Sequence, residues 1–227
     1  NGLENGIGTS YPLDGIVYKG EFKDGLRSGQ GKYINTNSGM SYEGEWLNDL
    51  FHGFGIYNFG DGTIYEGEFK SAKRNGQGKM SWPNGTIYDG EWLNDKKDGE
   101  GKQEYPEGHK LHKYEGGWKN NRLNGQGVLF FSNGAKYEGG WKNDRYNGFG
   151  TMIEPDGRKY KGNWKNDKKD GQGVYIWPDG QTYIGEWQND EREGYSIEIY
   201  SDGSMLWGER KENTLQKGLK VNSLMFI

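Results

Sequence analysis

A motif of the form Tyr-x-Gly-x-Trp/Phe returns about every 23 residues along almost the whole chain. Self-similarity at such a period is typical of repeat arrays, in which each unit buries its apolar side only against its neighbours. The copies begin at Tyr18, Tyr42, Tyr65, Tyr88, Tyr114, Tyr137, Tyr160 and Tyr183. This repetition predicts an extended surface that holds partners, and it argues against a fold that closes over a substrate.

Two further landmarks accompany the copies. Gly-x-Gly begins eleven positions after the Tyr in seven of them, as at Gly171 and Gly173, and loses its second Gly only after Tyr183. A small polar residue plus Gly precedes the Tyr, as at Asp156-Gly157. Asp-Gly and Asn-Gly supply the positive φ angles of tight hairpin turns. Between the turns the residues alternate with period two, which indicates strands. We therefore predict antiparallel strands joined alternately by a tight Asp/Asn-Gly turn and by a six-residue polar loop such as Lys165–Asp170.

Glycine and the aromatic residues are expected to form one packing device. The chain has 41 glycines and 9 tryptophans, and rings from one strand can cover Gly-x-Gly on the next. The predicted fold is all-β: an elongated single-layer antiparallel β-meander of about eight to nine hairpin repeats of 23 residues each. The array is expected to span 1–203, with a truncated half-repeat at 1–15 marked by Gly6 and Gly8. Residues 204–227 are expected to be a degenerate last repeat that caps the array, or alternatively a dimerisation segment.

The composition excludes several classes of function. Lys and Arg number 29 against 33 Asp and Glu, so the net charge of −4 disfavours nucleic acid as a partner. No cysteine is present to ligate a metal, and His109 and His112 alone are too few for a metal site. No stretch approaches the ~20 apolar residues of a membrane span. No nucleophile, base and orienting group cluster in the repeats, so we predict no enzyme activity, no catalytic residue, no metal and no cofactor.

Tyr-x-Gly-x-Trp, a polar loop, Gly-x-Gly and Asp/Asn-Gly together resemble the MORN (membrane occupation and recognition nexus) repeat, over residues 1 to about 203. The resemblance implies an elongated scaffold without catalytic residues. Such scaffolds occur in ciliary and flagellar radial spokes, in the cortical cytoskeleton, at plasma-membrane contacts and on myosin tails. It also implies a cytoplasmic protein that is associated with the cytoskeleton, in a cilium, flagellum or cell cortex, and peripheral to membrane.

The first candidate surface is a groove along the aromatic ladders. These rings are expected to form the core of the ribbon, yet a single layer would leave one side of them uncovered, where a protein partner finds rigid anchors. The groove residues are Tyr42, Trp46, Tyr65, Phe69, Tyr88, Trp92, Tyr114, Trp118, Tyr137, Trp141, Tyr160, Trp164, Tyr183 and Trp187. We predict that the groove is covered by another protein, by a second copy in a homodimer, or by the chain's own C-terminal tail. The other protein would supply a helix or extended segment of a cytoskeletal or ciliary component, or a myosin-like tail.

The second candidate surface is a row of basic loops. Anionic lipid attracts each basic residue near a membrane surface by about 1 kcal/mol. The residues concerned are Lys70, Lys73, Arg74, Lys119 and Arg122. The favoured interpretation of these residues is a solvated edge that keeps the sheet soluble. The leading hypothesis is therefore a non-catalytic scaffold that binds a protein along the aromatic groove, and the alternative is a tether that contacts anionic phospholipid.

Overall fold

The computed structural model describes residues 4–221, and over this range the chain forms strands and turns without a helix. It divides into two compact units. Unit 1 comprises the residues up to Glu107 together with Trp118–Asn121, and unit 2 comprises Gly108–Gly117 together with the residues from Arg122 onward.

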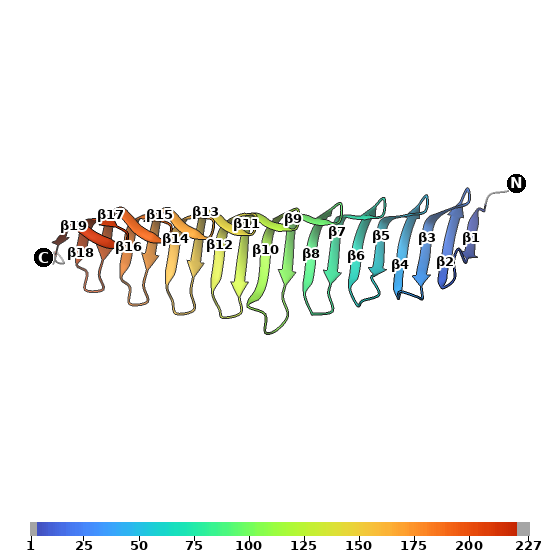
Figure 1. The fold of residues 1–227 in the computed structure, drawn as a ribbon, viewed down its shortest axis with the longest axis horizontal. Coiled ribbons are helices and arrows are strands. Elements are labelled where there is room, and N and C mark those ends of the chain that lie inside the picture. The colour runs from blue at the N-terminus through green and yellow to red at the C-terminus, as the bar shows by residue number, and fades with distance from the viewer. Residues whose placement is uncertain (1–3, 222–227) are drawn as a thin grey trace. The chain divides into compact units, whose positions relative to one another are not determined.

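Within each unit, every strand pairs antiparallel with the next strand in the sequence, as Figure 1 shows. The strands of unit 1 are β1 (Gly6–Ser10), β2 (Ile16–Lys23), β3 (Leu26–Asn35), β4 (Met40–Leu47), β5 (Leu50–Asn58), β6 (Ile64–Lys70), β7 (Lys73–Ser81), β8 (Ile87–Leu93) and β9 (Lys96–Glu104). Strand β10 (Leu111–Lys119) is divided between the units. The strands of unit 2 are β11 (Arg122–Phe131), β12 (Lys136–Lys142), β13 (Arg145–Ile153), β14 (Lys159–Lys165), β15 (Lys168–Ile176), β16 (Thr182–Gln188), β17 (Glu191–Ile199), β18 (Met205–Lys211) and β19 (Thr214–Val221). The prediction of an all-β antiparallel meander is confirmed.

The assignment of tight turns was wrong. The segment Lys165–Asp170 is not a six-residue loop, because β14 and β15 are joined by only two residues, Asn166 and Asp167. Both have positive φ, 50° and 70°, which is the geometry of a type I′ hairpin turn. Asn and Asp tolerate this conformation better than other residues with a side chain, so the turn needs no glycine.

The Asp-Gly and Asn-Gly pairs lie in the wider turns at the opposite ends of the strands. Between β15 and β16, the N–H of Gly180 donates to the carbonyl of Trp177 at 2.9 Å, and the Asp179 carboxylate accepts the N–H of Gln181 at 3.0 Å. Gly180 has a φ of 87°, so its predicted role as a positive-φ residue is confirmed. Figure 1 shows pointed turns at one end of the hairpins and broader loops at the other.

The tyrosine of each motif packs on the second glycine of the next Gly-x-Gly, as predicted. A Cβ added at Gly173 would overlap the Tyr160 ring, and one at Gly162 would lie 2.5 Å from the Cα of Gly173. The two strands therefore approach closely at this pair, and the ring fills the space that a side chain would take. Beside it the pairing slips between Gly162 and Trp164, a bulge that bends the strand.

The last repeat replaces aromatic packing with an ion cluster. Glu198 is 3% exposed, and its carboxylate lies 2.9 Å from Nη1 of Arg192 and 2.6 Å from Nη2 of Arg210. Strands β18 and β19 continue the meander beyond this cluster. These two strands expose Trp207 and Leu219, at 55% and 68%. The predicted cap and the dimerisation alternative both stay predictions. Residues 222–227 of that segment, like residues 1–3 of the half-repeat, lie outside the described residues.

Candidate functional site

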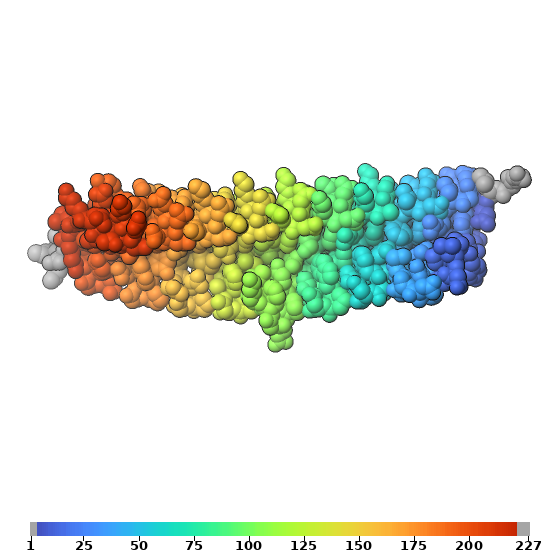
Figure 2. Space-filling view, in the orientation of Figure 1, coloured from blue at the N-terminus to red at the C-terminus, as the bar shows by residue number. Residues whose placement is uncertain are grey.

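The aromatic ladders are the interior of the protein. Every tyrosine, tryptophan and phenylalanine assigned to the groove is at most 7% exposed. The expectation that a single layer leaves one side of these rings uncovered is therefore wrong. In the space-filling view, side chains close the gaps that the ribbons leave between neighbouring strands of each unit (Figure 2). Whether these rings bind a partner stays a prediction.

Backbone carbonyls accept the hydrogen bonds of most of the buried rings, although Nε1 of Trp187 is buried without a partner. Tyr65 Oη donates to the carbonyl of Glu68 at 3.0 Å, and the other ladder tyrosines repeat this bond three residues ahead. Trp92 Nε1 donates to the carbonyl of Gly78 at 2.8 Å. Burial raises the pKa of the Tyr65 phenol above its ordinary value. Because these hydrogen-bonding groups are already used within the protein, the rings have a structural role.

The cover over the ladders comes from a row of residues five positions after each motif's last aromatic residue. We call this set the cover row: Arg27, Phe51, Arg74, Lys97, Leu123, Tyr146, Lys169 and Arg192. The Arg27 guanidinium carbon lies 4.4 Å from the Trp46 ring, and Phe51 stacks on Tyr42 with centroids 4.0 Å apart. Sequence reasoning missed this row because the residues differ in type; the constant five-residue offset was the available signal.

Lys97 is the most enclosed cation of the cover row. Its ammonium lies 4.7 Å from the Tyr88 ring and 4.6 Å from the Trp118 ring, and it donates to Oε1 of Gln103. Burial lowers the pKa of this amine to about 8. The rings favour the charged form of the ammonium, whereas desolvation favours the neutral form.

An acidic or amide side chain in the next two-residue turn caps the cover row. Asp95 accepts the backbone N–H of Arg74 at 3.1 Å and also its Nε at 3.0 Å. In the same way Asp49, Asn121, Asp144, Asp167, Asp190 and Asn213 accept the N–H of a cover-row residue. For Asp49, burial raises the carboxyl pKa but hydrogen bonds from Arg27 outweigh this, so the pKa is lowered. The caps join consecutive hairpins at the turn ends.

Two adjoining cavities in unit 1 lie on the aromatic face, by which we mean the side of the sheet that carries the ladders. Their volumes are about 370 Å³ and 160 Å³, and both are lined by Phe51, Tyr57 and Ala72. Arg27 borders the larger and Arg74 the smaller. Phe59, at the rim of the smaller cavity, is 40% exposed and lies edge-on to Tyr57 at 4.6 Å. This is the part of unit 1 where aromatic surface is hollowed and open.

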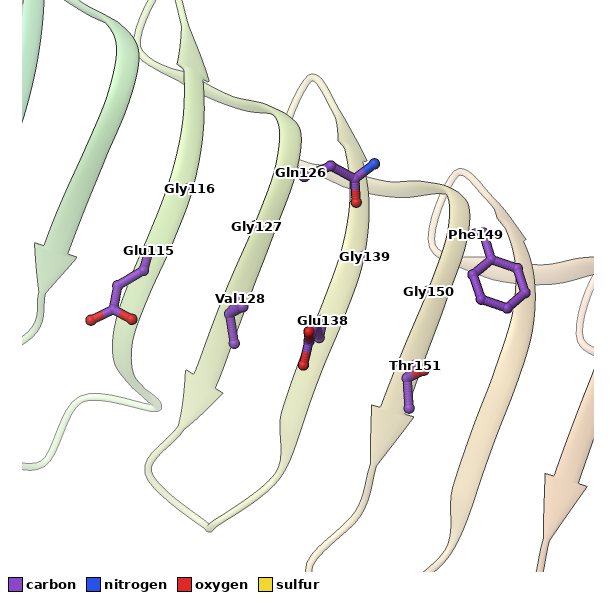
Figure 3. A pocket seen from close by; sticks show the side chains of 10 residues that line it. All are labelled: Glu115, Gly116, Gln126, Gly127, Val128, Glu138, Gly139, Phe149, Gly150 and Thr151. Carbon is purple, nitrogen blue, oxygen red and sulfur yellow. The ribbon is translucent and has the colours of Figure 1, made fainter.

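Unit 2 has its own cavity, of about 450 Å³, on the opposite face of the sheet (Figure 3). Its floor is glycine backbone, and Glu115, Val128, Glu138 and Thr151 lie in a row across neighbouring strands, with Phe149 above them. The two carboxylates are paired with lysines of their own strands, at 3.0 Å and 2.8 Å. Phe149 is 57% exposed.

The two units differ in the residue that precedes the ladder Trp or Phe. In strands β2, β4, β6 and β8 of unit 1 this residue is a glutamate; the Glu68 carboxylate, for example, accepts the N–H of Gln77 at 2.8 Å beside Gly76, whose φ is 107°. The corresponding residues of unit 2 are Gly117, Gly140, Asn163 and Glu186, so only the last supplies a carboxylate. Neither Gly117 nor Gly140 lines the cavity of unit 2.

The proposed lipid contacts do not form one class. Lys70 and Lys73 are exposed and flank a two-residue turn in unit 1, and Lys119 and Arg122 are exposed as well. Arg74 is different: its side chain is 19% exposed and its guanidinium lies 4.4 Å from the Trp92 ring. Its assignment to an exposed loop was wrong, because it belongs to the cover row. Their role in lipid binding stays a prediction.

Over residues 4–221, no group of three or more His, Cys, Asp and Glu side chains could hold a metal ion. His109 bonds within its own turn, where Nδ1 accepts the N–H of Leu111 at 3.1 Å. The same range contains no apolar helix of membrane-spanning length.

Three solved structures align with the chain, each with a TM-score below 0.5. The TCP domain of Drosophila melanogaster SAS-4 (dCPAP), in complex with a proline-rich motif of Ana2 (dSTIL), is 14% identical with a TM-score of 0.42, covering 70% of this chain and 84% of that one. The wild-type TCP10 domain of Danio rerio CPAP is 13% identical with a TM-score of 0.35, covering 94% and 98%. The same domain in complex with a peptide of Danio rerio STIL is 16% identical with a TM-score of 0.28, covering 81% of each chain.

No curated protein matches the chain in sequence. A family model does: the MORN repeat matches residues 18–40, 42–64, 65–87, 88–110, 114–136, 137–157, 160–182 and 183–205. These segments cover well over half of the chain and coincide with the hairpins described above. The protein is therefore a member of the MORN repeat family.

Proposed function

We propose that the protein is a non-catalytic scaffold that binds a segment of a protein partner on the aromatic face of unit 1. The observation that carries this proposal is the pair of adjoining cavities around Phe51, Tyr57 and Phe59, because hollowed aromatic surface supplies anchors of low conformational entropy. The ladder rings support the site from beneath, and the cover row, rather than the ladder, offers the contact surface.

Family membership supports placing the scaffold in a ciliary, flagellar or cortical cytoskeletal assembly. This location is part of the proposal and is tested by fluorescent tagging in the cell of origin. Anionic lipid has weaker support. Carboxylates stand among the exposed lysines of the loops, and Arg74 is engaged by Asp95 rather than free for a headgroup.

The test is a peptide selection on the full chain. A displayed library of natural protein segments is enriched on the wild type and then measured against Phe59→Glu, which places a charge at the rim of the cavity without removing a buried ring. Phe149→Glu, at a more exposed ring of unit 2, is the matched control. We expect the Phe59 variant to lose most of the selected segments and the Phe149 variant to keep them. Segments that bind both variants equally, or no enrichment at all, would overturn the proposal.

Ladder variants cannot serve this purpose. Trp118 and Trp141 are each 6% exposed, so their truncation to alanine unfolds the surrounding repeat and confuses lost binding with lost structure.

A further inference from the structure

One two-residue turn in unit 1 lacks the cap that its counterparts carry. The Phe51 carbonyl accepts the N–H of Ala72 at 2.9 Å. In an antiparallel strand the N–H and the carbonyl of one residue point to the same side, so the N–H of Phe51 also faces this turn. At Arg27 and Arg74 the equivalent N–H donates to Asp at 3.0 Å and 3.1 Å. Ala72 has no side-chain oxygen for that role.

The missing carboxylate is not explained by the missing cation. Phe51 is uncharged and needs no ion-pair partner, but Leu123 and Tyr146 of the cover row are uncharged too. Their N–H groups are nevertheless capped by Asp144 and Asp167, each at 2.8 Å. The cap therefore serves the backbone, and only at Ala72 among the turns following Arg27 to Arg192 is a residue without a polar side chain found.

The surroundings of this gap suit an anion with an apolar neighbour. Ala72 lines both cavities of the aromatic face, together with Phe51 and Tyr57. The two carboxylates that also line them, Asp49 and Asp95, are each held by an arginine, at 2.8 Å and 3.0 Å. The charges of Asp49 and Asp95 are therefore balanced within the cavities, which leaves a further carboxylate the cations Arg27 and Arg74 as neighbours on the cavity walls. The remaining walls of the cavities are largely aromatic rings.

We propose that the gap at Ala72 receives an aspartate or glutamate side chain of the partner segment, which accepts the N–H of Phe51 in place of the absent cap. A bulky apolar residue next to it in the partner fills the adjoining cavities. This proposal rests on the proposed function and names the chemistry of the segment: an acidic residue beside an aromatic or large aliphatic one. The partner's carboxylate would then make the contact that an Asp of the chain itself makes in other repeats.

The experiment is an NMR titration of the full ¹⁵N-labelled chain with the probe acetyl-Phe-Asp-Phe-amide. The matched probe acetyl-Phe-Asn-Phe-amide lacks only the charge. Two variants accompany the wild type: Ala72→Asp, which supplies the cap internally, and Ser71→Asp, which adds the same charge one residue away. Asp tolerates the positive φ of both positions, 60° and 50°, so both variants are expected to fold.

We expect the aspartyl probe to shift the Phe51 amide resonance and to bind about tenfold more tightly than the asparaginyl probe, the ratio of a charged to a neutral hydrogen bond. Ala72→Asp should abolish the shift, and Ser71→Asp should keep it. Equal binding of both probes, or an unchanged affinity in Ala72→Asp, would overturn the inference while leaving the scaffold proposal intact. The NMR titration does not depend on the peptide selection. A selection that enriches no segment would overturn the scaffold proposal, whatever the probes do to the Phe51 resonance.

Discussion

The two units carry the same repeat but lack different carboxylates. In unit 1, glutamates such as Glu68 fill the bulge on the face opposite the ladders, whereas one turn of the cover row, at Ala72, has no cap. In unit 2 the caps at Asp144 and Asp167 are present, whereas the bulge positions include Gly117 and Gly140. Unit 1 therefore lacks a carboxylate on the face that carries the ladders, whereas unit 2 lacks carboxylates on the opposite face.

This difference shows where a repeat array can place a binding site. The buried rings and the paired glycines are common to both units, so they define the fold and cannot distinguish one repeat from another. The carboxylates that accept backbone N–H groups vary between copies, and the two cavities on the aromatic face of unit 1 lie at the turn where one is missing. We therefore expect partner specificity to depend on positions where a carboxylate is missing, rather than on the residues of the repeated motif.

The largest effect should be shared by the units. Gly78→Ala in unit 1 and Gly150→Ala in unit 2 each place a methyl group against a buried tyrosine, with the new Cβ 2.7 Å from Cζ of Tyr137 in the second case. We expect each to destabilise its unit by about 3 kcal/mol through overpacking. Native-state hydrogen exchange would measure each unit separately. A loss below about 1 kcal/mol in either unit would mean that the tyrosine–glycine contact does not stabilise that unit as it does the other.

The next effect should separate the units. Gly140→Glu restores to unit 2 the residue type of unit 1, yet a Cβ at Gly140 would run into the carbonyl oxygen of Asn147. We expect it to destabilise unit 2 by about 2 kcal/mol, because the backbone there is shaped for glycine. Glu68→Ala in unit 1 should cost about 1 kcal/mol by leaving the N–H of Gln77 without its acceptor. If Gly140→Glu were stabilising, the backbone of unit 2 would accept a glutamate at this position as well as unit 1 does.

A smaller, reciprocal pair concerns the caps. Ala72→Asp should stabilise unit 1 by about 1 kcal/mol, since it adds a hydrogen bond to the Phe51 N–H at a position where Asp tolerates positive φ better than Ala. Asp167→Ala should destabilise unit 2 by a similar amount, because it removes the acceptor of the Tyr146 N–H. Denaturation midpoints followed by tryptophan fluorescence would report both. The prediction requires that the two variants change stability in opposite directions. If both variants were less stable than the wild type, alanine would already be the most stable residue for the turn at Ala72.

The sequence predicted the repeat, the strands, their pairing and the tyrosine–glycine contact, because each depends on a spacing that eight copies state repeatedly. It misassigned the turns because Asn-Asp is a weaker hairpin signal than Asn-Gly. In the structure, Asn166 and Asp167 nevertheless both adopt the positive φ of a tight turn. It also missed the cover row, where Phe51 and Arg74 perform one task with unlike side chains. A chemical role that changes residue type between copies leaves little trace in a motif.

The smallest effect is a dependence of stability on pH that begins in unit 1. The folded-state pKa of Lys97 is lowered to about 8, so between this value and about 10 the unfolded chain holds a proton that the folded chain has released. Stability should therefore rise with pH in that window, by less than about 1 kcal/mol once solvent screening is allowed for. Burial also lowers the pKa of Lys169 in unit 2, which adds to the rise. Above about pH 10 the sign reverses, because burial raises the phenol pKa of tyrosines such as Tyr65, and the unfolded chain then loses protons first.

Lys97→Met should flatten the part of this rise that belongs to unit 1 and leave the part from Lys169, whereas Lys96→Met, at the exposed neighbour, should leave the whole profile unchanged. Thermal unfolding between about pH 7 and pH 10, read unit by unit through hydrogen exchange, makes the comparison. An undiminished rise in Lys97→Met would show that the ammonium stays charged against the rings of Tyr88 and Trp118. Cation–π attraction would then outweigh desolvation in the aromatic layer, and the cations of the cover row would be stabilising in both units.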